Sequence, residues 1–191
     1  MTAVPAAPEA WIARETIRDL LTRVARGEDR RDAESIRAAF WPDATVDFGI
    51  FAGSFDDYLA WVTPGAAAVV LTQHVLGQTL VELDDTVARA ETHVTAYHRV
   101  DTGGEHRDLL LSGRYLDRFE RRAAHWRIVR RVMLYDWTQD LGASADWSRG
   151  LMGAPFSAGH FTGRTKSDHS TAFFERRVEE TMVCDRKDGD G

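Results

Sequence analysis

The chain has 191 residues, of which 43% are hydrophobic and 28% are charged, and its formal net charge is -6. This length and composition predict one soluble globular domain with a core of its own. The acidic balance argues against nucleic acid or an anionic membrane as a partner, and no apolar run approaches the roughly 20 residues that span a bilayer.

The N-terminus and the cysteine content favour a cytoplasmic protein. Residues Met1 to Glu9 lack the charged and apolar regions of a signal peptide. The single cysteine, Cys184, excludes an internal disulfide and a cysteine-based metal cluster. Six tryptophans and nine phenylalanines suit a pocket for a ring-containing ligand, although large aromatic side chains more often fill a core.

Two helices are predicted near the N-terminus. Apolar residues recur at helical spacing from Glu9 to Arg26, which indicates an amphipathic helix that ends at Gly27. A second helix is expected to begin after an N-cap at Asp32 and to stop before Pro42.

Short extended segments and a third helix follow. The alternation of Val46 and Phe48 with polar neighbours predicts a short strand, and residues 50–52 form a second extended piece. Ser54 is a suitable N-cap for a helix that ends before Pro64.

The next part of the chain predicts four long strands joined by short polar turns, which is typical of an antiparallel meander. Helices followed by such a sheet give an α+β fold. We therefore expect a flexible N-terminus at 1–8, one domain at 9–139, and an extension at 140–191 that covers the pocket or an interface. The predicted strands are residues 72–83, 87–100, 108–119 and 125–138.

The chain carries five segments in this order: ARGEDRRD at 25–32, FWPDATV at 40–46, TQHVLG at 72–77, GRYLD at 113–117 and WRIVRRVMLYDW at 126–137. Together they resemble the SnoaL-like branch of the NTF2-like superfamily over about residues 10 to 138. The resemblance implies a cone-shaped fold in which a curved antiparallel sheet wraps helices around a hydrophobic pocket. Members include dehydratases, a dehydrochlorinase, isomerases, cyclases and non-catalytic binding proteins, so the fold alone does not define the reaction.

The resemblance implies a catalytic pair at Asp29 and His74, since dehydratase and dehydrochlorinase members use an Asp–His dyad in this register. The chemistry fits, because imidazole has an ordinary pKa near 6.5 and a carboxylate on its other nitrogen orients it and stabilises the imidazolium. A surface position for Asp29 and a core position for His74 are the structural alternatives.

His98 and Arg131 are further candidates for catalysis. Some dehydratases of the superfamily place a second histidine on the strand of His98, although a solvent-facing histidine at a hairpin end is an equal alternative. Arg131 shares an apolar strand face with Met133 and Tyr135, so it needs a partner if it is buried. It can bind a leaving group or an enolate, or form an internal salt bridge, with Asp29 as one possible partner.

Other residues are predicted to bind the substrate rather than to react. We expect the pocket walls to include Val46, Phe48, Tyr58 and Trp61, with Tyr135 as a hydrogen-bond donor. Phe156, His160, Phe161 and Phe173 of the extension are candidates to close the pocket.

Two positions depart from the family pattern. Val24 stands where several members carry a polar residue, often tyrosine, and Arg31 stands where many have glycine.

The sequence predicts a cofactor-independent lyase, of dehydratase or related eliminating type, that acts on a small hydrophobic, hydroxylated compound, aromatic or polycyclic. Neither a cofactor nor a metal is expected. The alternatives are a non-catalytic ligand-binding or assembly module, and an isomerase or cyclase that uses the same base. The open face of the sheet predicts self-association into a homodimer or homotrimer.

Overall fold

The computed structural model describes residues 7–64, 68–157, 160 and 167–174. The chain divides into two compact units, Met1–Ser144 and Ala145–Gly191. Most of the predicted flexible N-terminus, residues 1–6, and Phe161 lie outside the described part. Within the described residues, the helices lack the length and apolar character of a bilayer-spanning segment.

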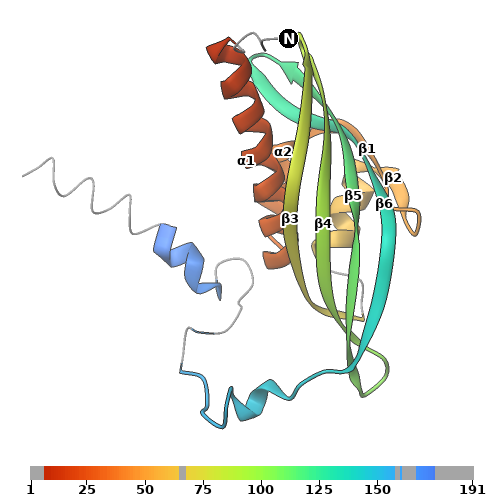
Figure 1. Cartoon of the computed structure of the whole chain (residues 1–191), viewed down its shortest axis with the longest axis vertical. Helices are drawn as coiled ribbons and strands as arrows, with labels where there is room; N and C mark the ends of the chain where they lie inside the picture. Colours follow the sequence, from red (N-terminus) through yellow and green to blue (C-terminus); the bar gives the residue numbers. More distant parts are fainter. Residues whose placement is uncertain (1–6, 65–67, 158–159, 161–166, 175–191) are drawn as a thin grey trace, which may run out of the picture. The chain divides into compact units, whose positions relative to one another are not determined.

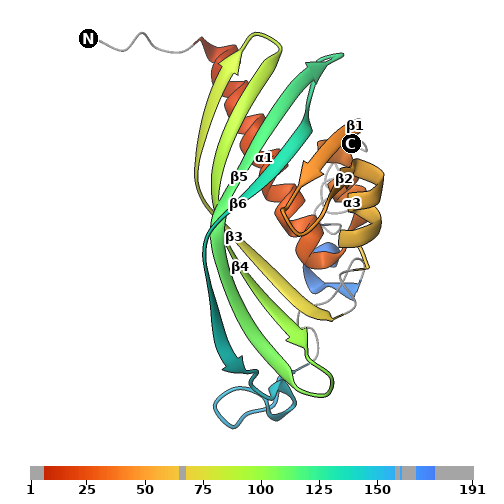
Figure 2. The same cartoon turned by 90° about the vertical axis from the view of Figure 1, so that its right-hand side faces the viewer.

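The first unit has the predicted α+β architecture, with a six-stranded sheet in the order β2-β1-β6-β5-β4-β3. The four long strands form the antiparallel meander that the sequence predicts, whereas β1 pairs in parallel with β6. Figures 1 and 2 show the long strands curving past α1. The elements are α1 (Pro8–Arg30), α2 (Ala33–Ala39), β1 (Phe40–Asp47), β2 (Ala52–Ser54), α3 (Phe55–Val62), β3 (Val69–Asp84), β4 (Val87–Asp101), β5 (His106–Arg122) and β6 (His125–Ala143).

The predicted end of the first helix at Gly27 is wrong, because α1 continues to Arg30. Gly27 instead permits close packing of two helices: a Cβ atom there would lie 2.7 Å from Cγ1 of Ile36. The helix ends at Arg31, which adopts the left-handed conformation with φ 55°. As a result Asp29 lies in the last helical turn and not in a loop.

The strand boundaries also differ from the predicted ones, while both predicted caps are confirmed. Asp32 accepts hydrogen bonds from the start of α2, and Ser54 accepts one from the backbone of Asp57. Strand β1 begins at residue 40, well before the predicted alternation of Val46 and Phe48, and β2 covers 52–54 instead of 50–52. Strand β6 extends five residues past the predicted 138, because residues up to Ala143 pair with the start of β5.

The core of the first unit lies where the helices pack against the inner face of the sheet. Helix α1 contributes a buried stripe at Ile17, Leu21 and Val24, with the three- and four-residue spacing of one helix face. The inner face of β5 contributes Tyr115 and Phe119. Other buried members include Ile36, Phe40, Ala44, Val46, Phe48, Phe55, Tyr58, Leu59, Val94, Trp126, Ile128 and Met133.

Gly113 is required where β5 and β6 approach each other at a register shift. A Cβ atom at this position would lie 2.0 Å from the carbonyl oxygen of Leu134, so the backbone must move to accept a side chain. We expect Gly113→Ala to lower the free energy of unfolding by about 1–3 kcal/mol in urea denaturation. Gly53→Ala is the control, since its Cβ atom meets neighbours only at 3.4 Å or more; equal effects of the two changes would contradict this explanation.

The second unit contains a short 3-10 helix, η1 (Trp147–Arg149), and residues 169–174 are helical. The rings of Trp147 and Phe156 lie 5.7 Å apart. Closure of the pocket by Phe156, His160 or Phe173 stays a prediction.

Candidate active site

A cavity of about 280 Å³ opens inside the first unit, with walls that are mostly apolar. It lies between the inner face of the sheet, the end of α1 and helix α3. The polar side chains of the lining therefore face a largely apolar space. The lining residues are Glu28, Arg31, Phe48, Ile50, Tyr58, Trp61, Val62, Val69, Thr72, His74, Ala96, His98, Val100, Leu109, Leu111, Tyr115, Met133, Tyr135 and Thr138.

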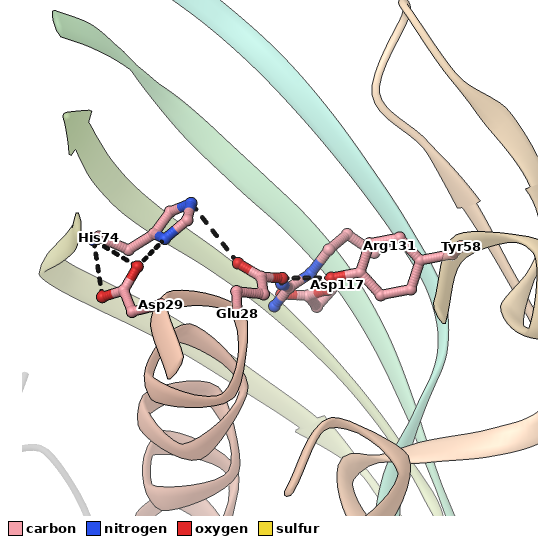
Figure 3. A network of polar contacts seen from close by, with 6 residues as sticks. All are labelled: Glu28, Asp29, Tyr58, His74, Asp117 and Arg131. Atoms are coloured by element: carbon pink, nitrogen blue, oxygen red, sulfur yellow. Dashed lines mark hydrogen bonds and ion pairs between the residues drawn. The ribbon is translucent and has the colours of Figure 1, made fainter. Parts of the chain in front are cut away.

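Asp29 and His74 are in direct contact (Figure 3). Oδ1 of Asp29 lies 2.7 Å from Nδ1 of His74, and the backbone N–H of His74 donates to both carboxylate oxygens at 3.1 and 3.0 Å. Because an ionised carboxylate only accepts hydrogen bonds, Nδ1 carries a proton in this pair. Each side chain is only 10% exposed, so the carboxylate fixes both the orientation and the tautomer of the ring.

His74 has a raised pKa although it is buried. Burial alone would lower the pKa, but the hydrogen bond that His74 donates to Asp29 and the negative charges of Glu28 and Asp29 outweigh it. Oε2 of Glu28 lies 3.5 Å from Nε2 of His74. The imidazole is thus placed between two carboxylates, one at each nitrogen.

Glu28 connects His74 to a buried charge network. Its Oε1 accepts a hydrogen bond from the hydroxyl of Tyr58 and lies 3.6 Å from Nη1 of Arg131. Arg131 also donates from Nε and Nη2 to the two oxygens of Asp117, at 2.8 and 3.0 Å. Burial and the Glu28 carboxylate raise the pKa of Tyr58 well above its ordinary value, so its hydroxyl remains a donor.

Arg131 forms the internal salt bridge that the sequence left open, with Asp117 and Glu28 as partners and not Asp29. Its side chain is 2% exposed, and Cζ lies 4.1 Å from the ring centroid of Tyr115. Arg131 is not among the residues that line the cavity. It therefore supports the site from behind the lining side chains.

His98 lines the cavity on β4, where the sequence placed it as a second histidine. Its ring is 6.0 Å from that of His74, in an edge-to-face arrangement. Burial, followed by the positive charge that His74 acquires, lowers the pKa of His98 to about 4. The environments of the two histidines thus shift their pKa values in opposite directions, as in many acid–base sites.

Four of the five expected binding residues line the cavity: Phe48, Tyr58, Trp61 and Tyr135. Val46 is buried in the core instead and is not a lining residue. The Tyr135 hydroxyl donates to the carbonyl oxygen of Phe48 at 3.0 Å, so its proton is used within the protein and not for the donor role that the sequence predicts; its oxygen can accept a hydrogen bond from a ligand. Among the residues that the structure describes, no group of three or more histidine, cysteine, aspartate or glutamate side chains could hold a metal ion.

The sequence from residue 9 to residue 132 matches the family model of the SnoaL-like domain. The chain belongs to the SnoaL-like domain family. Among curated proteins, the chain is similar to the uncharacterized protein Rv2910c of Mycobacterium tuberculosis, to which it is 28% identical over 120 residues. That match covers 61% of this chain and 80% of the relative, and an uncharacterized protein of Mycobacterium bovis matches equally well.

Solved structures share the fold of this SnoaL-like domain. The protein Kfla4162 from Kribbella flavida is 23% identical, with a TM-score of 0.61 over 68% of this chain and 95% of that chain. A putative scytalone dehydratase from Novosphingobium aromaticivorans is 22% identical, with a TM-score of 0.61 over 71% of this chain and 92% of that chain. The dehydrochlorinase LinA-type3 from Novosphingobium barchaimii is 16% identical, with a TM-score of 0.63 over 78% of this chain and 96% of that chain.

Glu28 and Asp117 are two charged residues of the site that the sequence analysis missed. Periodicity carried a signal for both. Glu28 continues the buried helical stripe four residues after Val24, and Asp117 lies between Tyr115 and Phe119 on the inner face of β5. A charged residue at a position that periodicity predicts to be buried needs a partner, and this marks it as a candidate for a site.

Proposed function

We propose that this SnoaL-like domain is a cofactor-independent lyase that eliminates water, or a related leaving group, from a small hydrophobic, hydroxylated compound. One observation carries the proposal: His74, hydrogen-bonded at Nδ1 to Asp29, lines an apolar cavity. Such a cavity accommodates a hydrophobic ligand, and the aromatic walls suit an aromatic or polycyclic one. The fold that it shares with a putative scytalone dehydratase and a dehydrochlorinase supports the proposal.

In the proposed reaction, neutral His74 takes a proton from carbon at Nε2. The electrons of the broken C–H bond form the double bond as the C–O bond breaks, and the imidazolium returns the proton to the departing oxygen, which leaves as water. Asp29 stabilises the imidazolium between the two proton transfers. General base catalysis of this kind contributes about 10²–10⁴-fold, so positioning in the cavity supplies the remainder.

The remaining polar groups have supporting roles in this proposal. Tyr135 accepts a hydrogen bond from a substrate hydroxyl, and His98, neutral because its pKa is about 4, orients a second oxygen. Arg131 does not contact the substrate in this scheme. It balances the buried charges of Glu28 and Asp117 and so contributes to the field that acts on developing charge.

A ligand-binding module is the second candidate, favoured by the mostly apolar surface of the cavity walls. An isomerase or cyclase would use the same base. A screen of hydroxylated aromatic and polyketide-like compounds separates these possibilities: loss of water supports the lyase, an isomer or ring-closed product supports the variants, and saturable binding without turnover supports the module. Assembly into a homodimer or homotrimer stays a prediction.

The pH dependence tests the proposed base. Because neutral His74 is the active form and its pKa is raised above 6.5, kcat/KM should rise with pH through that raised pKa and then level off. Asp29→Asn removes a cause of the raised pKa, so the rise should move to lower pH while the plateau falls by at least about 100-fold. Asp19→Asn, at an exposed carboxylate on the same helix, is the control. If Asp29→Asn left the pH profile of kcat/KM unchanged, the proposed pairing of Asp29 with His74 would be contradicted.

A further inference from the structure

We propose that Glu28 is a second carboxylate partner of His74, which accepts the Nε2–H that forms when the imidazole takes up a proton. This inference deepens the proposed lyase function and rests on it. Glu28 would then be a positioning residue that strengthens His74 as a base.

The last turn of α1 supplies both carboxylates. Glu28 and Asp29 are adjacent, so their side chains leave the helix about 100° apart and reach opposite nitrogens of one ring. Asp29 lies 2.7 Å from Nδ1 of His74, and Glu28 lies 3.5 Å from Nε2 (Figure 3). This arrangement depends on α1 continuing past Gly27, which the sequence did not predict.

The surroundings of Glu28 hold Oε2 toward His74. Oε1 is engaged by the hydroxyl of Tyr58 and by Nη1 of Arg131, whereas Oε2 makes the contact with the imidazole. Glu28 is only 5% exposed, so water screens its charge weakly. Since Asp117 already binds Nε and Nη2 of Arg131, the arginine compensates Glu28 only in part.

The charges that face His74 come from three elements. Helix α1 contributes the carboxylates of Glu28 and Asp29, β6 contributes the cation of Arg131, and β4 contributes the titratable but neutral ring of His98. In the neutral ring the Nε2 lone pair faces a carboxylate, which is unfavourable. In the imidazolium each N–H faces a carboxylate. Glu28 therefore favours the protonated ring, the state that proton abstraction from carbon creates.

The step remains balanced with Glu28 in this role. The carbon-bound proton moves to Nε2, and the negative charge of Oε2, 3.5 Å away, stabilises the imidazolium while the C–O bond breaks. The same proton then moves to the departing oxygen, and His74 returns to its neutral form. Glu28 keeps its charge throughout and contributes by stabilising the intermediate imidazolium.

The test is the titration of His74 in the ligand-free protein, followed by NMR with ¹⁵N-labelled histidine and assigned with the His74→Gln variant. We expect Glu28→Gln to lower the titration midpoint of His74 by about one pH unit or more, because an opposite charge at this distance is removed. Glu28→Asp should give a smaller decrease, since it keeps the charge but withdraws it from Nε2. A midpoint that neither variant moves overturns the inference.

Two controls separate a charge effect from general disruption of the network. Tyr58→Phe removes the donor to Oε1 but keeps the Glu28 charge, so it should not lower the midpoint. Glu82→Gln, at an exposed glutamate on the strand of His74, should leave it unchanged. If Tyr58→Phe lowers the midpoint as much as Glu28→Gln does, the shift reflects disruption and the inference fails.

Activity gives a second readout. In Glu28→Gln the rise of kcat/KM should move to lower pH together with the NMR midpoint, and the plateau should fall at least 10-fold, with partial recovery in Glu28→Asp.

The proposed lyase function and the proposed role of Glu28 can be refuted separately. An unchanged midpoint refutes the role of Glu28 even if the protein is a lyase, whereas a shifted midpoint without turnover of any compound refutes the lyase and leaves the carboxylate–imidazole contact established.

Discussion

Replacing His74 with glutamine should lower turnover by about 10²–10⁴-fold and leave the fold intact. Glutamine can keep a hydrogen bond to Asp29, but it cannot take a proton from carbon near neutral pH. His74 is a cavity-lining residue whose ring is held by a 2.7 Å contact, so its loss removes the base without opening the main core. The measurement is kcat/KM for a substrate found in the compound screen, with circular dichroism as the check on folding.

A matched control for this change is His93→Gln. His93 lies on β4 five residues before His98, but its side chain is on the opposite face of the sheet from buried Thr92 and Val94. It should therefore have wild-type activity. Undiminished turnover in His74→Gln would end the proposed mechanism, whatever the control gives.

Asp117→Ala should destabilise the protein by about 3–5 kcal/mol, since it removes one partner of a buried ion pair. The variant leaves the guanidinium of Arg131, whose side chain is 2% exposed, with Glu28 at 3.6 Å as its remaining carboxylate. The two bonds at 2.8 and 3.0 Å that satisfied Nε and Nη2 are lost. The free energy of unfolding from urea denaturation measures the effect.

The control for Asp117 is Asp136→Ala, which removes a partner of Arg114 at 3.2 Å in a pair that water reaches. Exposed ion pairs contribute about 0–1 kcal/mol, so this change should have a small effect. A loss below about 1 kcal/mol in Asp117→Ala would mean that the Arg131 network is not a principal source of stability.

Local patterns in the sequence were sufficient for the α+β class and the meander. Apolar periodicity defined the stripe of α1, and Asp32 and Ser54 marked helix starts through their capping oxygens. The errors arose where tertiary contacts override local signals. Gly27 predicts a helix end on its own, but Ile36 packs against it and the helix continues. The last residues of β6 have little strand character, and their pairing with β5 makes them a strand.

The candidate site was predictable only in part. The resemblance to the SnoaL-like family put Asp29 and His74 in register, whereas neither periodicity nor spacing pairs two residues that are 45 positions apart. The partners of Arg131 required the structure, because Asp117 is on a neighbouring strand and Glu28 on a helix. Burial of these carboxylates could have been predicted from periodicity, but their contacts could not.

A crystal structure of the protein soaked with a pool of hydroxylated aromatic and polyketide-like compounds tests the central claim most directly. The account predicts ligand density in the cavity, with a carbon-bound hydrogen of the ligand directed at Nε2 of His74, a ligand atom within about 3–3.5 Å of that nitrogen, and Asp29 on Nδ1. A cavity filled by the protein's own side chains, with Asp29 paired to an arginine, would contradict it.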